Sequence, residues 1–146
     1  MKYNEMNMKD AIKKNTAWNL LQVATFARVQ AQHIADDYDL TSTQLYALCS
    51  LDPTRPISMR NISLVLECDA SNVTGLVDRL LHHGYVERHE LPDDRRVKVV
   101  SLTDKGIALR AEALQRLAEA PLDGLQYLSP GERVLLDELL VKMLTK

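Results

Sequence analysis

The chain has 146 residues, of which 46% are hydrophobic and 26% charged, and its formal net charge is −2. This length predicts one domain with a real hydrophobic core, and the composition excludes an intrinsically disordered chain. The longest apolar runs are far shorter than a membrane span, and the first ten residues are polar and of mixed charge, unlike a secretory signal. We therefore expect a soluble, cytoplasmic protein.

A long helix is predicted over about residues 10–37, where apolar side chains recur at helical spacing. They cover more than one stripe of the helix, which favours burial against a second surface such as another subunit. A second helix is predicted after Thr41, because Thr41 and Gln44 have the capping-box spacing. Pro53 and Pro56 break the helical pattern that follows.

The next segment has the pattern of two short helices separated by a tight turn. Ser58 is placed to cap the first, and Asp69 to cap the second. In the second, apolar residues recur at helical spacing from Val73 to Leu81, and Gly84 fits the position just beyond a helix end. Together these features predict a helix-turn-helix.

An antiparallel hairpin is predicted directly after Gly84. The stretches YVERHE and VKVVSL each alternate apolar and polar residues, and ELPDDRR supplies a turn between them. Arg95 and Arg96 then lie at the hairpin tip, next to Asp94. A hairpin following a helix-turn-helix is a wing.

Two more helices are predicted at the C-terminal end. Thr103 is placed to cap one that extends to about Ala120, and Ser129 opens a capping box with proline at the first helical position. The fold class expected is mainly α with a small antiparallel β-wing, a winged helix-turn-helix flanked by long N- and C-terminal helices. We expect one domain over residues 1–146, with a DNA-binding lobe at about 41–102 and dimerisation helices at about 10–37 and 103–146.

The second helix of the helix-turn-helix carries a small, polar face opposite its apolar stripe. Asparagine can pair bidentately with adenine and arginine with guanine or phosphate, whereas serine and threonine suit phosphate oxygens. Glycine inside a helix costs about 1 kcal/mol relative to alanine, and close approach to DNA is one reason to keep it. A simple solvated face remains the alternative for this helix. The candidate DNA-binding residues here are Ser71, Asn72, Thr74, Gly75, Asp78 and Arg79.

Asp94, Arg95 and Arg96 complete the candidate DNA-binding set at the wing tip. Arginine gains most from the electronegative potential of a narrow minor groove. An acid beside phosphates should repel them, so we expect Asp94 to hold the arginine fork through a charge-assisted contact. The alternative is an ordinary exposed ion pair of little energetic weight. Net charge does not support DNA binding, because residues 55–105 carry equal numbers of acidic and basic side chains. The DNA-binding hypothesis therefore depends on where the basic side chains lie.

No metal or cofactor site is expected from the sequence. The four histidines are scattered without partner ligands at metal-binding spacing, and Cys49 and Cys68 form no CxxC pair. We expect Cys49 to be a core residue and Cys68 to lie in the turn before the second helix of the helix-turn-helix. Whether either thiol has a redox role is left open.

Residues from about Leu40 to Gly106 resemble the MarR family of bacterial transcription regulators. The resemblance rests on Leu40-Thr41 with Gln44, on the block DASNVTGLVDRLLHHGYVER, and on Asp94 and Arg96 ahead of Leu102-Thr103 and Gly106. It implies an obligate homodimer on a pseudo-palindromic operator of double-stranded DNA, with a helix in the major groove and the wing in the minor groove. It also implies release by a small aromatic or phenolic effector or by thiol oxidation.

The sequence departs from the family pattern at Leu81, where many relatives carry glutamate, and at Ser63, where alanine is usual. No cysteine lies in the first helix, which argues against the peroxide-sensing mode of one branch. For a phenolic effector the resemblance points to Trp18, Phe26 and Tyr46 as candidate ligand-binding residues, in a cleft between the dimer helices and residues 41–51. The alternative for all three is a place in the core.

The expected function is therefore sequence-specific binding of double-stranded DNA by a homodimeric transcription regulator, a repressor controlled by a small effector. No enzyme is expected, because catalytic triads, phosphate loops and paired-carboxylate motifs are absent from the sequence. A winged-helix protein-interaction module without DNA binding is the remaining alternative, although such a surface favours exposed aromatic residues. The operator, the effector, and the choice between repression and activation stay open.

Overall fold

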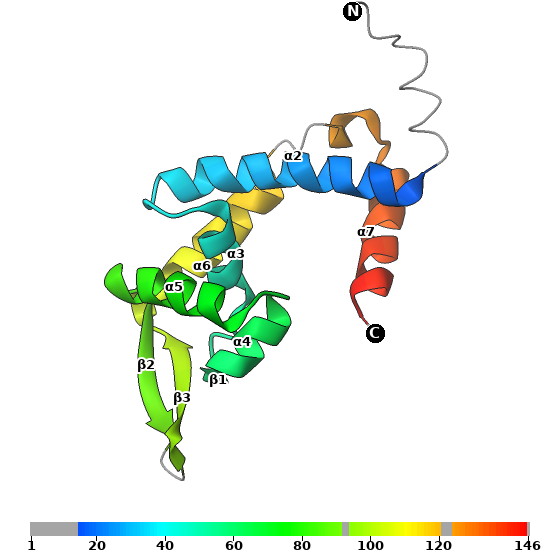
Figure 1. Cartoon of the computed structure of the whole chain (residues 1–146). Coiled ribbons are helices and arrows are strands. Elements are labelled where there is room, and N and C mark those ends of the chain that lie inside the picture. The colour runs from blue at the N-terminus through cyan, green and yellow to red at the C-terminus, as the bar shows by residue number, and fades with distance from the viewer. Residues whose placement is uncertain (1–14, 92–93, 121–123, 146) are drawn as a thin grey trace, which may run out of the picture. The chain divides into compact units, whose positions relative to one another are not determined.

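The computed structural model describes residues 15–91, 94–120 and 124–145, except for the side chains of Leu91 and Arg95 (Figure 1). In chain order the elements are α2 (Thr16–Asp36), α3 (Ser42–Ser50), β1 (Ile57–Ser58), α4 (Met59–Val65), α5 (Ala70–His82), β2 (Val86–Leu91), β3 (Asp94–Leu102), α6 (Asp104–Glu119), η1 (Leu125–Tyr127) and α7 (Pro130–Leu144). The expected class, mainly α with a small antiparallel sheet, is confirmed. The first five residues of the helix predicted at 10–37 lie outside the described ranges, and the helix ends at Asp36, one residue earlier than predicted.

The chain divides into two compact units. The central unit comprises Ala31–Glu119, and the terminal unit comprises the described residues of 1–30 and 120–146. The central unit is larger than the lobe expected at about 41–102, since it also includes the end of α2 and all of α6. The reason is burial: Leu109 and Ala113 of α6 lie in the same core as the helix-turn-helix.

The core of the central unit is apolar and receives side chains from α3, α4, α5, α6 and the sheet. Burying one such side chain contributes roughly 1.5–3 kcal/mol, and this packing fixes which face of each helix is left for solvent. On α5 the buried positions are the predicted stripe of Val73, Leu76, Val77 and Leu80. The largest fully buried side chains are Leu45, Leu48, Ile62, Leu80, Val73, Val77 and Val100.

Hydrogen bonds at the helix starts follow most of the sequence expectations. Thr41 and Gln44 form the predicted capping box, and the Ser58 hydroxyl accepts a hydrogen bond from the backbone N–H of Asn61 at 3.2 Å. Asp69 occupies the N-cap position of α5, but its side chain makes no capping hydrogen bond, so this prediction is wrong in its mechanism. In the turn before α5, the Cys68 N–H donates to the Ser63 carbonyl at 3.1 Å and so closes the end of α4.

Three helices end in a residue of left-handed conformation, which lets the next N–H groups reach back to the last turn. Gly84 does so after α5 with φ 71°, as predicted. Asp39 after α2 (φ 53°) and Glu67 after α4 (φ 48°) adopt the same conformation without being glycine. Because a side chain is strained there, Asp39 and Glu67 are positions where a function beyond the turn can explain the residue.

The wing is a sheet of three antiparallel strands in the order β1-β3-β2, so the sequence missed β1. Ile57 of β1 pairs with Val100, and β2 pairs with β3 from Val86 opposite Leu102 to Glu90 opposite Lys98. The register then shifts, and Leu91 pairs with Asp94. Strand β3 therefore begins at Asp94, earlier than the predicted VKVVSL, and Arg95 and Arg96 follow where the register is irregular.

The wing and α5 are joined to the start of α6 by a short set of polar contacts. The Thr103 hydroxyl donates to the Gly84 carbonyl at 2.7 Å and accepts from the Gly106 N–H at 3.1 Å, so Thr103 caps α6 as predicted. Gly106 is buried, and a Cβ atom there would lie 1.9 Å from the Tyr85 carbonyl oxygen. Helix α6 can approach this closely only because residue 106 has no side chain.

The described helices of the terminal unit expose many large apolar side chains. Helix α7 has no buried residue, and seven of its large apolar side chains are exposed. Its N-terminus is the capping box predicted at Ser129. On α2, Trp18, Leu21, Val23, Phe26 and Val29 are also exposed. Among the described helices, none combines the length and apolar character needed to cross a membrane.

Candidate nucleic-acid interface

All six candidate residues of α5 are exposed, on the side away from the apolar stripe: Ser71, Asn72, Thr74, Gly75, Asp78 and Arg79. Nothing in the described structure lies within 4 Å of where a Gly75 Cβ would be, so no contact inside the chain requires a glycine there. A depression of about 420 Å³ runs beside this face, lined by Ser71, Asn72 and Gly75 together with residues of α3. The Thr74 hydroxyl donates to the Ala70 carbonyl at 2.9 Å.

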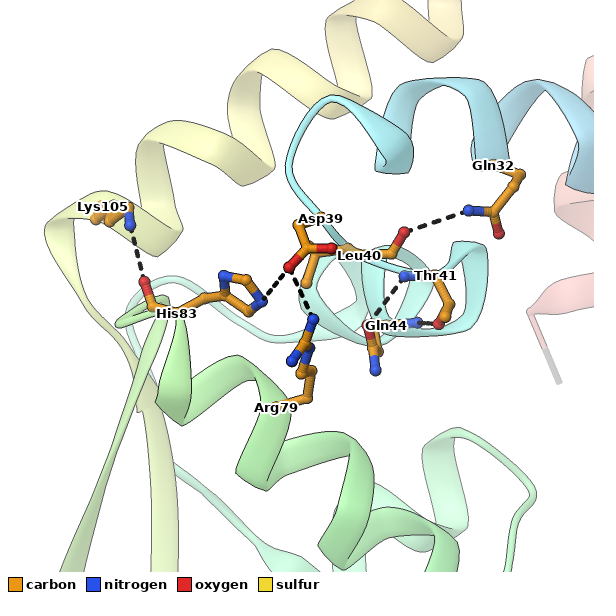
Figure 2. A network of polar contacts seen from close by, with 8 residues as sticks. All are labelled: Gln32, Asp39, Leu40, Thr41, Gln44, Arg79, His83 and Lys105. Carbon is orange, nitrogen blue, oxygen red and sulfur yellow. Dashed lines mark hydrogen bonds and ion pairs between the residues drawn. The ribbon is translucent and has the colours of Figure 1, made fainter.

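Arg79 is held by an ion pair that the sequence did not indicate. Its Nη2 lies 2.8 Å from Oδ2 of Asp39, the residue that closes α2 (Figure 2). Nε2 of His83 is 3.8 Å from the same oxygen, and Figure 2 shows both side chains converging on Asp39. Arg79 is thus tied at one edge of the α5 face and remains partly open to solvent.

Asp78 is held in the same way at the other edge of α5. Its Oδ1 accepts a hydrogen bond from Nη2 of Arg88 on β2 at 2.9 Å, whereas the buried Nε of Arg88 has no hydrogen-bond partner among the described residues. Arg88, Arg60 and Lys98 line a cleft of about 400 Å³ that also includes Thr74. The Asp78–Arg88 pair therefore connects α5 to the wing, and the cleft holds three basic side chains beside the α5 face.

The wing tip has the contact that the sequence predicted. Oδ1 of Asp94 accepts hydrogen bonds from the Arg96 backbone N–H at 3.0 Å and from its Nε at 3.3 Å. The Arg96 side chain is otherwise 93% exposed, so its remaining N–H groups face solvent. The Arg95 side chain lies outside the described part of the chain, and its predicted role stays a prediction.

Sequence reasoning missed Asp39, Arg60, Arg88 and Lys98 as parts of this surface. Arg88 could have been predicted from the sequence, because side chains alternate along a strand. This alternation puts Arg88 on the same face of β2 as the buried Val86. Asp39 had no such signal. It is 40 residues from Arg79, and only the packing of the last residues of α2, Ile34 and Ala35, in the shared core brings the two together.

The three candidate effector-binding residues are exposed, so the alternative that they are core residues of this chain is wrong. The exposed fractions are 48% for Trp18, 46% for Phe26 and 60% for Tyr46. Trp18 and Phe26 lie on α2 in the terminal unit, and Tyr46 lies on α3 in the central unit. Each is available for contacts beyond its own unit.

The two cysteines lie in different surroundings. Cys49 packs against the core, where burial raises the pKa of its thiol and so reduces the reactive thiolate at neutral pH. Cys68 is half-buried and lines the depression beside Ser71 and Asn72. Within the described ranges, no cluster of three or more His, Cys, Asp or Glu side chains is placed to hold a metal ion.

A helix-turn-helix with an exposed polar second helix, followed by a hairpin with arginine at its tip, defines a winged-helix DNA-binding fold. The model of the MarR family matches residues 40–98. The transcriptional repressor NicR of Pseudomonas putida is 33% identical over 77% of this chain and 72% of its own length. By these matches the chain belongs to the MarR family of transcription regulators.

Further relatives agree with this assignment. Multiple antibiotic resistance protein MarR of Salmonella typhimurium is 37% identical over 53% of this chain, and the match spans about half (54%) of that relative. A solved structure of BpsR from Bordetella bronchiseptica superposes with a TM-score of 0.70 at 26% identity, covering 91% of this chain and 95% of the other. That structure concerns the regulation of BpsR's DNA binding by 6-hydroxynicotinic acid.

Proposed function

We propose that this protein is a transcription repressor that binds double-stranded DNA sequence-specifically, as a homodimer on a pseudo-palindromic operator. The observation that carries the proposal is the exposed α5 face with Ser71, Asn72 and Gly75, next to a wing whose tip presents Arg96 to solvent. Such a helix fits the major groove, where asparagine can read adenine, and such an arginine fits the minor groove. The role is binding, with no catalytic step.

We expect the protein to select one sequence from a pool of random duplexes and to bind it more tightly than a scrambled duplex of equal length. Contacts from Arg96 and other basic side chains to phosphates should make the affinity fall steeply with salt concentration. Fluorescence anisotropy across a salt series measures both quantities. Binding without salt dependence or sequence preference would contradict the proposal and favour the protein-interaction module.

The exposed apolar side chains of α2 and α7 support the homodimer. Large apolar side chains exposed in such number on one chain favour an interface, and most soluble homodimers are two-fold symmetric. We expect sedimentation equilibrium to give twice the chain mass at micromolar concentration, with reading helices about 34 Å apart, roughly one turn of DNA. A stable folded monomer at that concentration, or a selected site without inverted half-sites, would refute this arrangement.

We further propose that a small aromatic or phenolic acid releases the repressor from DNA, with Trp18, Phe26 and Tyr46 as the candidate contacts. The regulation of the related BpsR by 6-hydroxynicotinic acid supports a ligand of this chemistry. Because Trp18 is the only tryptophan, its fluorescence reports on a single position. Salicylate or 6-hydroxynicotinate at millimolar concentration should change that fluorescence and weaken DNA binding, whereas cyclohexanecarboxylate should do neither. If neither aromatic acid has an effect, the effector proposal fails.

A further inference from the structure

Asp39 occupies a position where the turn alone would favour glycine. It lies in the turn after α2 in the left-handed conformation with φ 53°, and the next N–H, that of Leu40, reaches back to the Ala35 carbonyl at 3.0 Å. Aspartate tolerates this conformation less well than glycine does. The residue is therefore better explained by its carboxylate than by the turn it makes.

The carboxylate of Asp39 contacts one functional group of the candidate DNA interface. Its Oδ2 is 2.8 Å from Nη2 of Arg79, and this is the one hydrogen bond that the Arg79 guanidinium makes within the described residues. The side chains of Arg79 and Asp39 are 42% and 80% exposed, and ion pairs this open to solvent add little to stability. The ion pair therefore affects the position and charge of Arg79 more than it affects the stability of the fold.

Arg79 follows Asn72 by two helical turns and Gly75 by one, so these three residues share one side of α5. An arginine carries five N–H donors in a planar fork, and a single contact through Nη2 leaves most of them for DNA. Asp39 comes from the turn between α2 and α3, outside the helix-turn-helix itself (Figure 2). Asp39 therefore acts on α5 from a separate element of the fold.

We propose that Asp39 is a specificity-determining residue of the DNA interface, acting as a positioning residue for Arg79. This inference rests on the proposed DNA-binding function. The carboxylate orders the fork and cancels its charge locally, so Arg79 adds little to the sequence-independent attraction of phosphates. Without Asp39, a free Arg79 binds phosphate on any duplex, and discrimination falls.

The decisive variant is Asp39→Asn, because asparagine also tolerates the left-handed conformation and the turn is kept. For a scrambled duplex we expect the affinity to rise about 5-fold and the salt slope to steepen by about 0.9, the value for one added phosphate contact. Affinity for the duplex selected by the wild-type protein should change less than about 2-fold, because the lost ordering of the arginine offsets the added charge. The ratio of the two affinities should therefore fall at least about 2.5-fold.

Asp37→Asn is the matched control. It removes the same charge two residues earlier, but Asp37 pairs with Arg116 of α6 at 2.6 Å and does not touch Arg79. It should leave the affinity ratio unchanged. Asp39→Gly, which also keeps the turn, should reproduce the effect of Asp39→Asn. In the Arg79→Gln protein, Asp39→Asn should have no further effect on the ratio.

The inference is overturned if Asp39→Asn leaves the ratio unchanged, if Asp37→Asn lowers it equally, or if the effect persists without Arg79. It is also overturned if Asp39→Asn tightens binding to the selected duplex more than to the scrambled one, since the pair would then be a lock that inhibits binding. These outcomes leave the proposed function intact when the wild-type protein discriminates between the two duplexes. Should the wild-type protein select no sequence, both proposals fail.

Discussion

Replacing Gly106 with alanine should lower the free energy of unfolding by about 3 kcal/mol or more, because the added Cβ meets backbone that cannot move aside. The Cβ would lie 1.9 Å from the Tyr85 carbonyl oxygen and 3.2 Å from Cδ2 of Leu102. Relief requires α6 to shift, and a shift breaks the hydrogen bond from the Thr103 N–H to the Tyr85 carbonyl at 3.1 Å. Urea denaturation at one fixed protein concentration measures the loss, since the stability of a dimer depends on concentration.

Gly75→Ala is the matched control for Gly106→Ala. Nothing in the described structure lies within 4 Å of its Cβ position, so alanine in mid-helix should raise the free energy of unfolding, by up to about 1 kcal/mol. If the helix approaches DNA closely, the same variant should bind DNA more weakly while being more stable.

Equal stability of Gly106→Ala and the wild-type protein would show that α6 does not pack on Tyr85 as described.

Replacing Arg96 with alanine should weaken DNA binding on the order of 1–3 kcal/mol and lower the salt slope by about one. The loss should be nearly equal for selected and scrambled duplexes, because a wing arginine meets mainly the potential of the minor groove and the phosphates. Asp94→Ala should act in the same direction but more weakly, since the arginine remains and only the contacts at 3.0 and 3.3 Å that order it are lost. Arg96→Lys keeps the charge and should keep the salt slope.

Replacing Asn72 with alanine should reduce sequence discrimination, whereas Arg96→Ala should reduce affinity for all duplexes. It removes a partner of base edges, so discrimination should relax at one or two base pairs of each half-site, by a similar energy and with little change in salt slope. Anisotropy against duplexes with single base-pair changes distinguishes the two variants. If Arg96→Ala leaves affinity and salt slope unchanged, the wing tip is an ordinary solvated hairpin and its proposed role is wrong.

Features that depend on near neighbours in the chain could be predicted from the sequence. The capping boxes at Thr41 and Ser129, the left-handed Gly84 and the apolar stripe of α5 formed where the pattern indicated, and the hairpin formed with its second strand starting earlier than predicted, at Asp94. Each involves residues a few positions apart, so a local pattern contains all of the information. The contact between Asp94 and Arg96, two residues apart, belongs to the same group.

The exceptions among the local predictions depend on geometry that lies outside the local pattern. Strand β1 has only two residues and exists because β3 supplies its partners at Val99 and Val100. Two residues are too few for an alternating pattern to predict a strand. The Asp69 side chain makes no capping hydrogen bond, although aspartate is favoured at the N-cap position that it occupies. Propensity identifies the residue that could make a contact, but the surrounding geometry decides whether it does.

The sequence by itself determined the winged helix-turn-helix, the order of its helices and hairpin, the exposed face of α5 and the residues at the wing tip, because periodicity and capping are local properties. Only the tertiary structure decided that α6 belongs to the central unit, that Gly106 is required by Tyr85, and that Asp39 and Arg88 hold the two edges of α5. Such pairs depend on the packing of a shared hydrophobic core, which brings side chains from distant segments within hydrogen-bonding distance and leaves no mark on either segment alone.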